Sequence, residues 1–232
     1  MRPIDKGTVP VDDAGNEIHF AKYQEARPYL IQRLGELCSY CEMHLDSGLA
    51  VEHVQPKSLS PENERDWDNL LLACPNCNSS KGNAAINDSN MDDYLWPDRH
   101  NTFLALIYRE GGIVKANPEL NADIQQRAAR LINLVGLDRT PDKVRDATDR
   151  RWMNRIEAWD LASRSRERLM RQDSNTMREQ IVDQANDYFS IWMTFFEDDV
   201  DMRQRFIRKF RGTCTACFDE NGTTRVRIPG QV

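Results

Sequence analysis

The 232-residue chain lacks a run of about 18 apolar residues, an apolar stretch at its N-terminus and an excess of positive charge. Because the long apolar run is missing, we expect no membrane-spanning helix. Because no apolar stretch follows Met1, we expect no secretory signal and therefore a cytoplasmic protein. The sequence also contains no internal repeat or low-complexity tract, and its length suits one large or two small domains with a sizeable core.

The missing positive charge bears on the partners of the chain. Its net charge is −6, whereas a dedicated nucleic-acid binder is usually basic. Residues 38–100 hold 4 Lys or Arg against 11 Asp or Glu, and residues 101–232 hold 22 against 20. Positive charge therefore lies mostly in the second half of the chain or has to come from a partner.

The cysteines follow a metal-binding pattern. In a cytosolic chain of this size, six cysteines are expected to be metal-bound or reduced rather than paired in disulfides. Cys38, Cys41, Cys74 and Cys77 are spaced Cys-x2-Cys-x32-Cys-x2-Cys, so two short knuckles can complete one tetrahedral site. Such a site has no open position, and we therefore expect a structural zinc ion.

A third pair, Cys214 and Cys217, has no histidine nearby in the sequence. Two thiolates alone cannot fill a tetrahedral site. We interpret this pair as buried thiols, with a redox role as the alternative.

A set of reactive side chains accompanies the zinc cysteines. Glu52 and His53 lie between the two knuckles, and Asn78 directly follows the second. Hydrolysis of a phosphodiester needs an activated water and a group that holds charge on the leaving oxygen. His53 suits the role of base, since its pKa lies near neutrality. Glu52 and Asn78 offer hard oxygen ligands for Mg²⁺ or Mn²⁺.

The positions of Glu52 and His53 leave two arrangements open. Adjacent residues of a regular strand point to opposite faces. Either a local irregularity turns Glu52 toward the metal, or His53 acts from the opposite side of the scissile phosphate.

Three further residues are candidates for the site. Asn69 is positioned to orient His53, and Lys57 and Lys81 are candidate phosphate contacts. The alternative for His53 is a structural histidine, and for Asn69 a plain loop residue. The other histidines, at positions 19, 44 and 100, are not accompanied by such a set of reactive side chains, and we interpret them as ordinary residues.

These motifs carry a resemblance. The succession Cys-x-x-Cys, Glu-His-x-x-Pro, Asn-Leu and Cys-x-x-Cys-Asn-x-x-Lys-Gly resembles an HNH endonuclease of the ββα-metal class with a zinc knuckle. The resemblance implies that His53 is the general base, Asn69 the middle asparagine and Asn78 the final metal ligand. Glu52 takes a place where these enzymes commonly have Asp.

A longer resemblance extends to both ends of the chain. The opening Met-Arg-Pro-Ile-x-Lys-Gly, the Trp-Asp-Asn-Leu-Leu-Leu-Ala-Cys run ending at Cys74 and the late Cys-Phe-Asp from Cys217 are similar to PtuB-like HNH proteins. These accompany a PtuA-like ABC-type ATPase in Septu and some retron antiphage systems. The resemblance implies a toxic nuclease that a partner controls.

The predicted fold is α+β and predominantly helical: a ββα-metal HNH core with a four-cysteine zinc knuckle, followed by a helical C-terminal half. We expect an N-terminal arm and helix over 1–37, the nuclease module over 38–100, and a hairpin and helical region for partner or substrate binding over 101–232. Boundaries near 96–101 or 116–121 are candidates, and a core shared by both halves is the alternative.

Individual elements follow from local signals. Residues 1–20 are expected to form an irregular, partly extended arm because they contain several prolines and glycines. A hairpin is expected from 103–108 and 113–115. Periodicity and capping residues predict helices over 28–36, 121–135, 140–171, 174–195 and 198–210.

The second half contains many arginines among acidic residues. A basic helix face for nucleic acid is one interpretation, and a solvated, ion-paired face is the other. The arginines concerned are Arg145, Arg150, Arg151, Arg155, Arg164, Arg166, Arg168 and Arg171.

The leading functional hypothesis is a metal-dependent endonuclease that hydrolyses DNA. No base-reading motif separates DNA from RNA, so a ribonuclease that cuts, for example, tRNA is an alternative. A zinc-stabilised interaction module without catalysis is another, although such a scaffold has no need of His53, Asn69 and Asn78.

Overall fold

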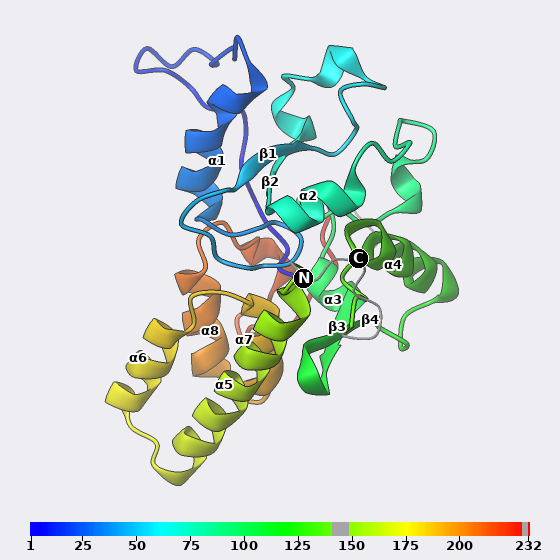
Figure 1. Cartoon of the computed structure of the whole chain (residues 1–232). Helices are drawn as coiled ribbons and strands as arrows, with labels where there is room; N and C mark the ends of the chain where they lie inside the picture. Colours follow the sequence, from blue (N-terminus) through cyan, green and yellow to red (C-terminus); the bar gives the residue numbers. More distant parts are fainter. Residues whose placement is uncertain (141–148, 229–231) are drawn as a thin grey trace.

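The computed structural model describes residues 1–140, 149–228 and 232 (Figure 1). The helices and strands are α1 (Arg27–Leu34), β1 (Ala50–His53), β2 (Leu70–Ala73), α2 (Pro75–Lys81), α3 (Thr102–Ala105), β3 (Leu106–Arg109), β4 (Ile113–Ala116), α4 (Ala122–Val135), α5 (Arg151–Arg171), α6 (Asn175–Gln184), α7 (Phe189–Phe195) and α8 (Val200–Lys209). Short 3-10 helices lie at Tyr23–Ala26, Pro61–Asn63, Trp67–Asn69, Met91–Asp93, Glu110–Gly112 and Thr215–Cys217. None of the helices in the described ranges combines the length and apolar composition needed to cross a bilayer.

The strands β1 and β2 and the helix α2 form a ββα unit. The strands pair antiparallel, with Glu52 opposite Leu71 and His53 opposite Leu70. Every residue of β2 is buried, as expected of an entirely apolar strand covered on both faces. Pro75 occupies the first position of α2, where its missing N–H costs no hydrogen bond. This unit and the helix-rich second half confirm the predicted fold class.

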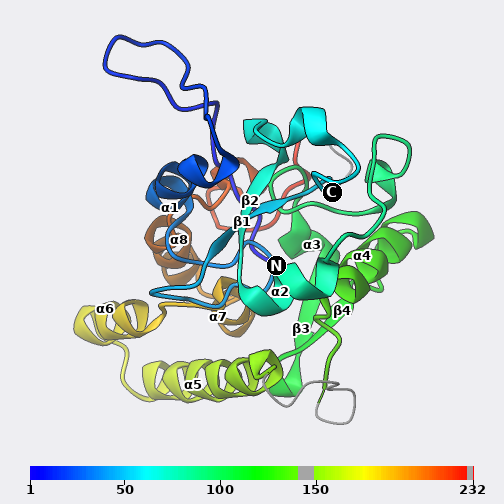
Figure 2. The same cartoon turned by 45° about the horizontal axis from the view of Figure 1, so that its top comes forward.

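The N-terminal arm is irregular, as predicted, but its beginning belongs to the core. Met1 and Ile4 are fully buried, and the Asp5 N–H donates to the Gly212 carbonyl at 2.8 Å. Gly212 has a φ of 72°, and a Cβ there would lie 2.5 Å from the carbonyl oxygen of Arg33. The close approach therefore requires glycine. The later part of the arm projects from the body (Figure 2).

Packing crosses the predicted boundaries between the two halves. The helix α2 of the first half packs against α4 of the second. The Asn101 side chain donates to the carbonyls of Cys217 and Arg225 at 2.9 and 2.7 Å. One cluster of buried apolar residues includes members from both halves. The three-part division stays a prediction, and these contacts favour the alternative of a shared core.

Two elements begin at other residues in the structure than the sequence predicted. Residues 102–105 form α3 instead of the first part of a strand, because the Asn101 side chain accepts a hydrogen bond from the Leu104 N–H and caps a helical turn. The helix predicted over 140–171 is observed from Arg151. Its expected start falls on residues 141–148, which lie outside the described residues.

The single helix predicted over 174–195 is two helices, α6 and α7. Tyr188 interrupts it with a φ of 49°, and its N–H donates to the Glu42 carbonyl at 3.1 Å. The buried Glu42 carboxylate accepts from the Ser190 N–H at 2.8 Å and from the Ser190 hydroxyl at 2.6 Å. Glu42 thus satisfies donors at the start of α7 from a loop 148 residues away in the chain. Helical periodicity cannot report such a contact.

The arginines in and before α5 differ in their exposure to solvent. Arg151 and Arg155 are buried, Arg164 and Arg168 are exposed, and Arg145 lies outside the described residues.

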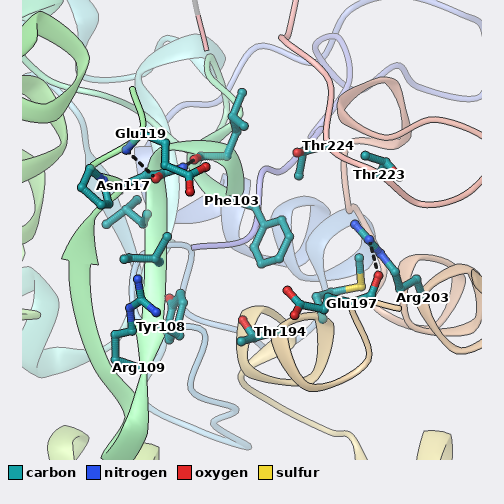
Figure 3. A pocket seen from close by; sticks show the side chains of 15 residues that line it. Phe103, Tyr108, Arg109, Asn117, Glu119, Thr194, Glu197, Arg203, Thr223 and Thr224 are labelled. Atoms are coloured by element: carbon teal, nitrogen blue, oxygen red, sulfur yellow. Dashed lines mark hydrogen bonds between the residues drawn. The ribbon is translucent and has the colours of Figure 1, made fainter. Parts of the chain in front are cut away.

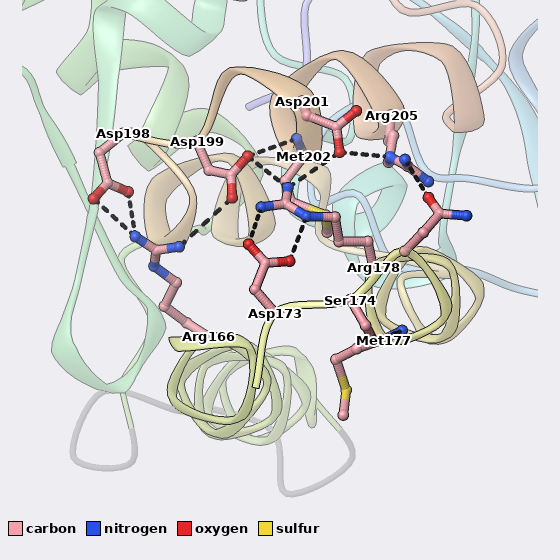
Figure 4. A network of polar contacts seen from close by, with 11 residues as sticks. Arg166, Asp173, Ser174, Met177, Arg178, Asp198, Asp199, Asp201, Met202 and Arg205 are labelled. Carbon is pink, nitrogen blue, oxygen red and sulfur yellow. Dashed lines mark hydrogen bonds and ion pairs between the residues drawn. The ribbon is translucent and has the colours of Figure 1, made fainter. Parts of the chain in front are cut away.

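The half-buried Arg166 belongs to an ion-pair network between α5, α6 and α8 (Figure 4). It donates to both carboxylate oxygens of Asp198, at 2.7 and 2.8 Å. Arg178 on α6 pairs with Asp173 and Asp199. The ion-paired interpretation therefore holds for this part of the helix.

Candidate active site and metal centre

Four cysteine sulfurs form a buried cluster beside the ββα unit. Cys38 and Cys41 lie before β1, and Cys74 and Cys77 lie at the start of α2. All four sulfurs lie within 4.8 Å of one another, and those of Cys41 and Cys74 are 3.7 Å apart. A tetrahedral zinc ion with Zn–S bonds of about 2.3 Å separates its sulfurs by about 3.8 Å. The cluster therefore fits the predicted structural zinc, which would tie the two knuckles together.

A buried arginine from the helical half contacts this cluster. The Arg151 guanidinium donates to the Cys77 sulfur at 3.0 Å and to the Val135 carbonyl at 2.7 Å. Asp149 fixes the same guanidinium through two hydrogen bonds of 2.9 and 2.8 Å. Four thiolates around Zn²⁺ leave two negative charges, so the positive charge of Arg151 stabilises a loaded centre. The contact also ties the start of α5 to the metal site.

His53, the last residue of β1, is half-buried and points away from Glu52. Its Nε2 lies 2.9 Å from the Glu64 carbonyl, and its ring packs edge-on against Tyr23 with 4.6 Å between centroids. A carbonyl only accepts hydrogen bonds, so Nε2 carries the proton and Nδ1 keeps a free lone pair. Burial lowers the pKa of His53, and the charge of Lys57 adds to this, while the Glu64 carbonyl opposes it. The imidazole is therefore neutral near pH 7, as a general base must be.

The carboxylate of Glu52 faces α2 and is only 3% exposed. Its Oε1 lies 2.7 Å from the Lys81 ammonium, and its Oε2 accepts a 2.6 Å hydrogen bond from the Tyr40 hydroxyl. Burial raises the pKa of Glu52, and both partners oppose that shift. Both carboxylate oxygens are paired here, and the expected role of Glu52 as a metal ligand stays a prediction.

Lys81 is buried beside Glu52. It is 3% exposed, and besides Glu52 it contacts the His53 carbonyl at 2.7 Å. A buried, paired ammonium does not suit the expected phosphate contact. Lys57, in contrast, is half-exposed, lies over the Tyr23 ring and pairs with Glu64 at 3.6 Å. Its position beside His53 is compatible with a phosphate contact.

The two candidate asparagines lie in different environments. Asn69 is buried; its Oδ1 accepts from the Gln55 N–H at 2.7 Å, and its amide group donates to the Asn63 and Gln55 carbonyls. Asn69 therefore fixes the loop that follows His53, without contacting the imidazole. Asn78 is exposed on α2, so its side-chain oxygen is accessible to a cation.

Sequence reasoning missed Tyr23, Tyr40, Glu64 and Arg151. Tyr40 lies inside the first Cys-x-x-Cys motif, but nothing in the spacing marks its contact with Glu52. Glu64 contributes a backbone carbonyl, which any residue has. Arg151 lies 74 positions from Cys77.

A separate cavity of about 380 Å³ lies in the second half (Figure 3). Tyr108 and Arg109 of β3 line one side, and Glu197 and Arg203 line another. No residue of the 38–100 module lines it, so this cavity is not part of the candidate active site. Cys214 and Cys217 are both buried, in agreement with their interpretation as buried thiols.

Comparison with known proteins places the module in a family. Residues 38–84 match the family described as HNH endonuclease. A 78-residue stretch is 36% identical to "Septu protein PtuB" from Bacillus thuringiensis. This match covers 31% of the present chain and only 29% of the length of that relative. Residues 38–84 are therefore similar to HNH endonucleases, and part of the chain is similar to PtuB.

We expect Arg151→Met to weaken zinc retention without removing a zinc ligand, because the variant leaves the charge of the thiolate cluster without its buried partner. The rate of zinc release to a chromogenic chelator should rise at least about tenfold, whereas Cys74→Ser should prevent stable loading. Arg168→Met, an exposed change on the same helix, is the control. Equal release rates for the Arg151 and Arg168 variants would contradict a role of Arg151 at the metal centre.

Proposed function

We propose that this chain is a metal-dependent HNH endonuclease that hydrolyses phosphodiester bonds of DNA as the effector of an antiphage system. The observation that carries the proposal is the state of His53. Its Nε2 lies 2.9 Å from the Glu64 carbonyl, which leaves Nδ1 to take a proton, and burial lowers its pKa. The family match over residues 38–84 supports a nuclease.

The proposed chemistry needs one proton acceptor from the protein. A water oxygen attacks the phosphorus while Nδ1 of His53 takes its proton, and the bond from phosphorus to the leaving ester oxygen breaks. The leaving oxygen then takes a proton from solvent. A bound Mg²⁺ or Mn²⁺ ion would neutralise charge on the phosphate and leaving group. We propose Glu52 and the exposed Asn78 as its ligands, and Lys57 as a phosphate contact.

The charge balance of residues 38–100 supports control by a partner. This segment contains 4 basic and 11 acidic residues, so it offers few positive side chains to the phosphates of a nucleic acid. Each missing phosphate contact weakens the binding of nucleic acid. The resemblance to PtuB leads us to propose a PtuA-like ABC-type ATPase as the partner. Residues beyond 100 or the N-terminal arm are the proposed contact region.

Replacement of the proposed base tests the function directly. His53→Ala should lower the cleavage rate of plasmid DNA by at least about 100-fold, since a positioned general base contributes that much or more. Zinc content and the unfolding midpoint should stay near those of the wild type. His44→Ala changes a histidine outside the site and is the control. Parallel assays with total RNA distinguish the ribonuclease alternative, and absence of any cleavage by wild type with its ATPase would favour a non-catalytic module.

The pH dependence of cleavage should reflect the lowered pKa of His53. The base acts only when neutral, so the rate should fall as the pH drops through a value below 6.5, the ordinary pKa of histidine. Lys57 and Lys81 both lower this pKa and Glu64 raises it, so Lys57→Met should move the midpoint upward. Single-turnover rates between pH 4.5 and 8 measure the profile. A midpoint above 7 in the wild type would contradict the assignment.

Association with the ATPase gives a further prediction. Size-exclusion chromatography of the co-expressed pair should show one complex, and cleavage by the nuclease chain alone should be weak and more sensitive to salt. A chain that elutes alone yet cuts DNA at the rate of the mixture would refute the partner proposal.

A further inference from the structure

We propose that Tyr23, from the segment before α1, is a positioning residue of the candidate active site, where its ring holds the His53 imidazole and the Lys57 ammonium together. The inference rests on the proposed function, since that function assigns His53 as the base and Lys57 as a phosphate contact. Tyr23 lies outside residues 38–84, the part of the chain that matches the nuclease family.

The ring of Tyr23 completes the support of the imidazole. Tyr23 begins the 3-10 helix Tyr23–Ala26, which contacts β1. Its ring centroid lies 4.6 Å from that of His53, with 66° between the ring planes. Among the described residues, the imidazole makes one hydrogen bond, from Nε2 to the Glu64 carbonyl. A single hydrogen bond fixes one atom of the ring and leaves the ring free to tilt about that atom. The contact with Tyr23 opposes this tilt, so Nδ1 keeps one direction.

The same ring holds the side chain of Lys57. The Lys57 ammonium lies 4.7 Å from the centroid of the Tyr23 ring, within the range of a cation–π contact. The Glu64 carboxylate pairs with this ammonium at 3.6 Å. Because Lys57 is half-exposed and its stem is flexible, its charge would otherwise be spread over many positions. The two contacts keep the charge next to His53, which is where a phosphate has to lie for the base to act on the attacking water.

The ring of Tyr23 carries this role without its hydroxyl. The hydroxyl has no hydrogen-bond partner among the described residues, and the contacts with His53 and Lys57 are both made by the ring. Phenylalanine offers the same ring, whereas leucine keeps an apolar side chain but has no aromatic face or edge. This difference allows the role of the ring to be tested separately from the loss of apolar volume.

The test compares Tyr23→Leu, which removes the ring, with Tyr23→Phe, which keeps it. Lys57→Met is made alone and in the Tyr23→Leu background. Tyr29→Leu is the matched control, because Tyr29 is also half-buried but packs against Phe20, with 5.9 Å between the ring centroids. The zinc content of each variant is measured first, and all variants are compared at a temperature where they are folded.

Two readouts follow cleavage of DNA. Tyr23→Leu should lower kcat by about 10- to 100-fold, as expected when a catalytic group moves by about 1 Å, and Tyr23→Phe should stay within about twofold of wild type. Lys57→Met should raise KM by about threefold or more in the wild-type background. In the Tyr23→Leu background it should change KM by less than about twofold, because the ammonium is no longer held in place. Tyr29→Leu should leave both constants near those of wild type.

These constants also give the outcomes that would overturn the inference. A Tyr23→Phe variant as slow as Tyr23→Leu would assign the effect to the hydroxyl. An unchanged kcat in Tyr23→Leu would show that the base needs no support from the ring. Effects of Tyr23→Leu and Lys57→Met on KM that simply multiply would show that the ring does not hold Lys57.

A third readout needs no cleavage. The Nε2 proton of His53, which the Glu64 carbonyl accepts, is followed by NMR, and its exchange with water should be at least about tenfold faster in Tyr23→Leu. Tyr23→Phe and Tyr29→Leu should exchange as wild type does. If wild type cuts no nucleic acid, the proposed function fails, while this exchange pattern still supports the contact between Tyr23 and His53. Unchanged exchange in Tyr23→Leu overturns the inference whatever the activity.

Discussion

The convergence of four thiols is the constraint on which the rest of this structure depends. The ββα unit consists of two four-residue strands and a seven-residue helix, which are too short to be stable alone. Their arrangement relies on Cys38 and Cys41 meeting Cys74 and Cys77 in one buried cluster. Metal binding to such a cluster contributes folding free energy directly. The ends of β1 and α2, and with them the candidate base, are positioned as a consequence.

Buried charge joins this small unit to the rest of the protein. Arg151 connects the cysteine cluster to α5, and Glu42 connects the loop after Cys41 to the start of α7. Each of these groups has partners of opposite polarity at hydrogen-bonding distance, so burial does not leave it uncompensated. These contacts hold the ββα unit in a defined relation to α5 and α7.

Strand alternation divides the candidate site into two faces. Glu52 lies on the closed face against α2, where its charge is fully paired. His53 lies on the other face with Tyr23 and Lys57, where one ring nitrogen stays available. β1 is regular over Ala50–His53, so the structure contains no local irregularity there that turns Glu52 and His53 to one face.

The sequence by itself determined the features encoded by neighbouring residues. The cysteine spacing predicted the cluster, the Glu-His pair and the second knuckle marked the ββα unit, and Asn121 with Gly136 marked the ends of α4. Such signals are local, because ligand spacing, strand alternation and helix caps extend over only a few residues.

Only the tertiary structure decided which charges meet. Lys81 and Glu52 are 29 positions apart, and the sequence predicted a phosphate contact for one and a metal ligand for the other; the structure pairs their side chains at 2.7 Å. The interruption before α7 and the contact of Arg151 with Cys77 also depend on segments distant in the chain. No local sequence pattern predicts these contacts. A buried charge needs a partner, and the fold determines which distant residue lies close enough to provide it.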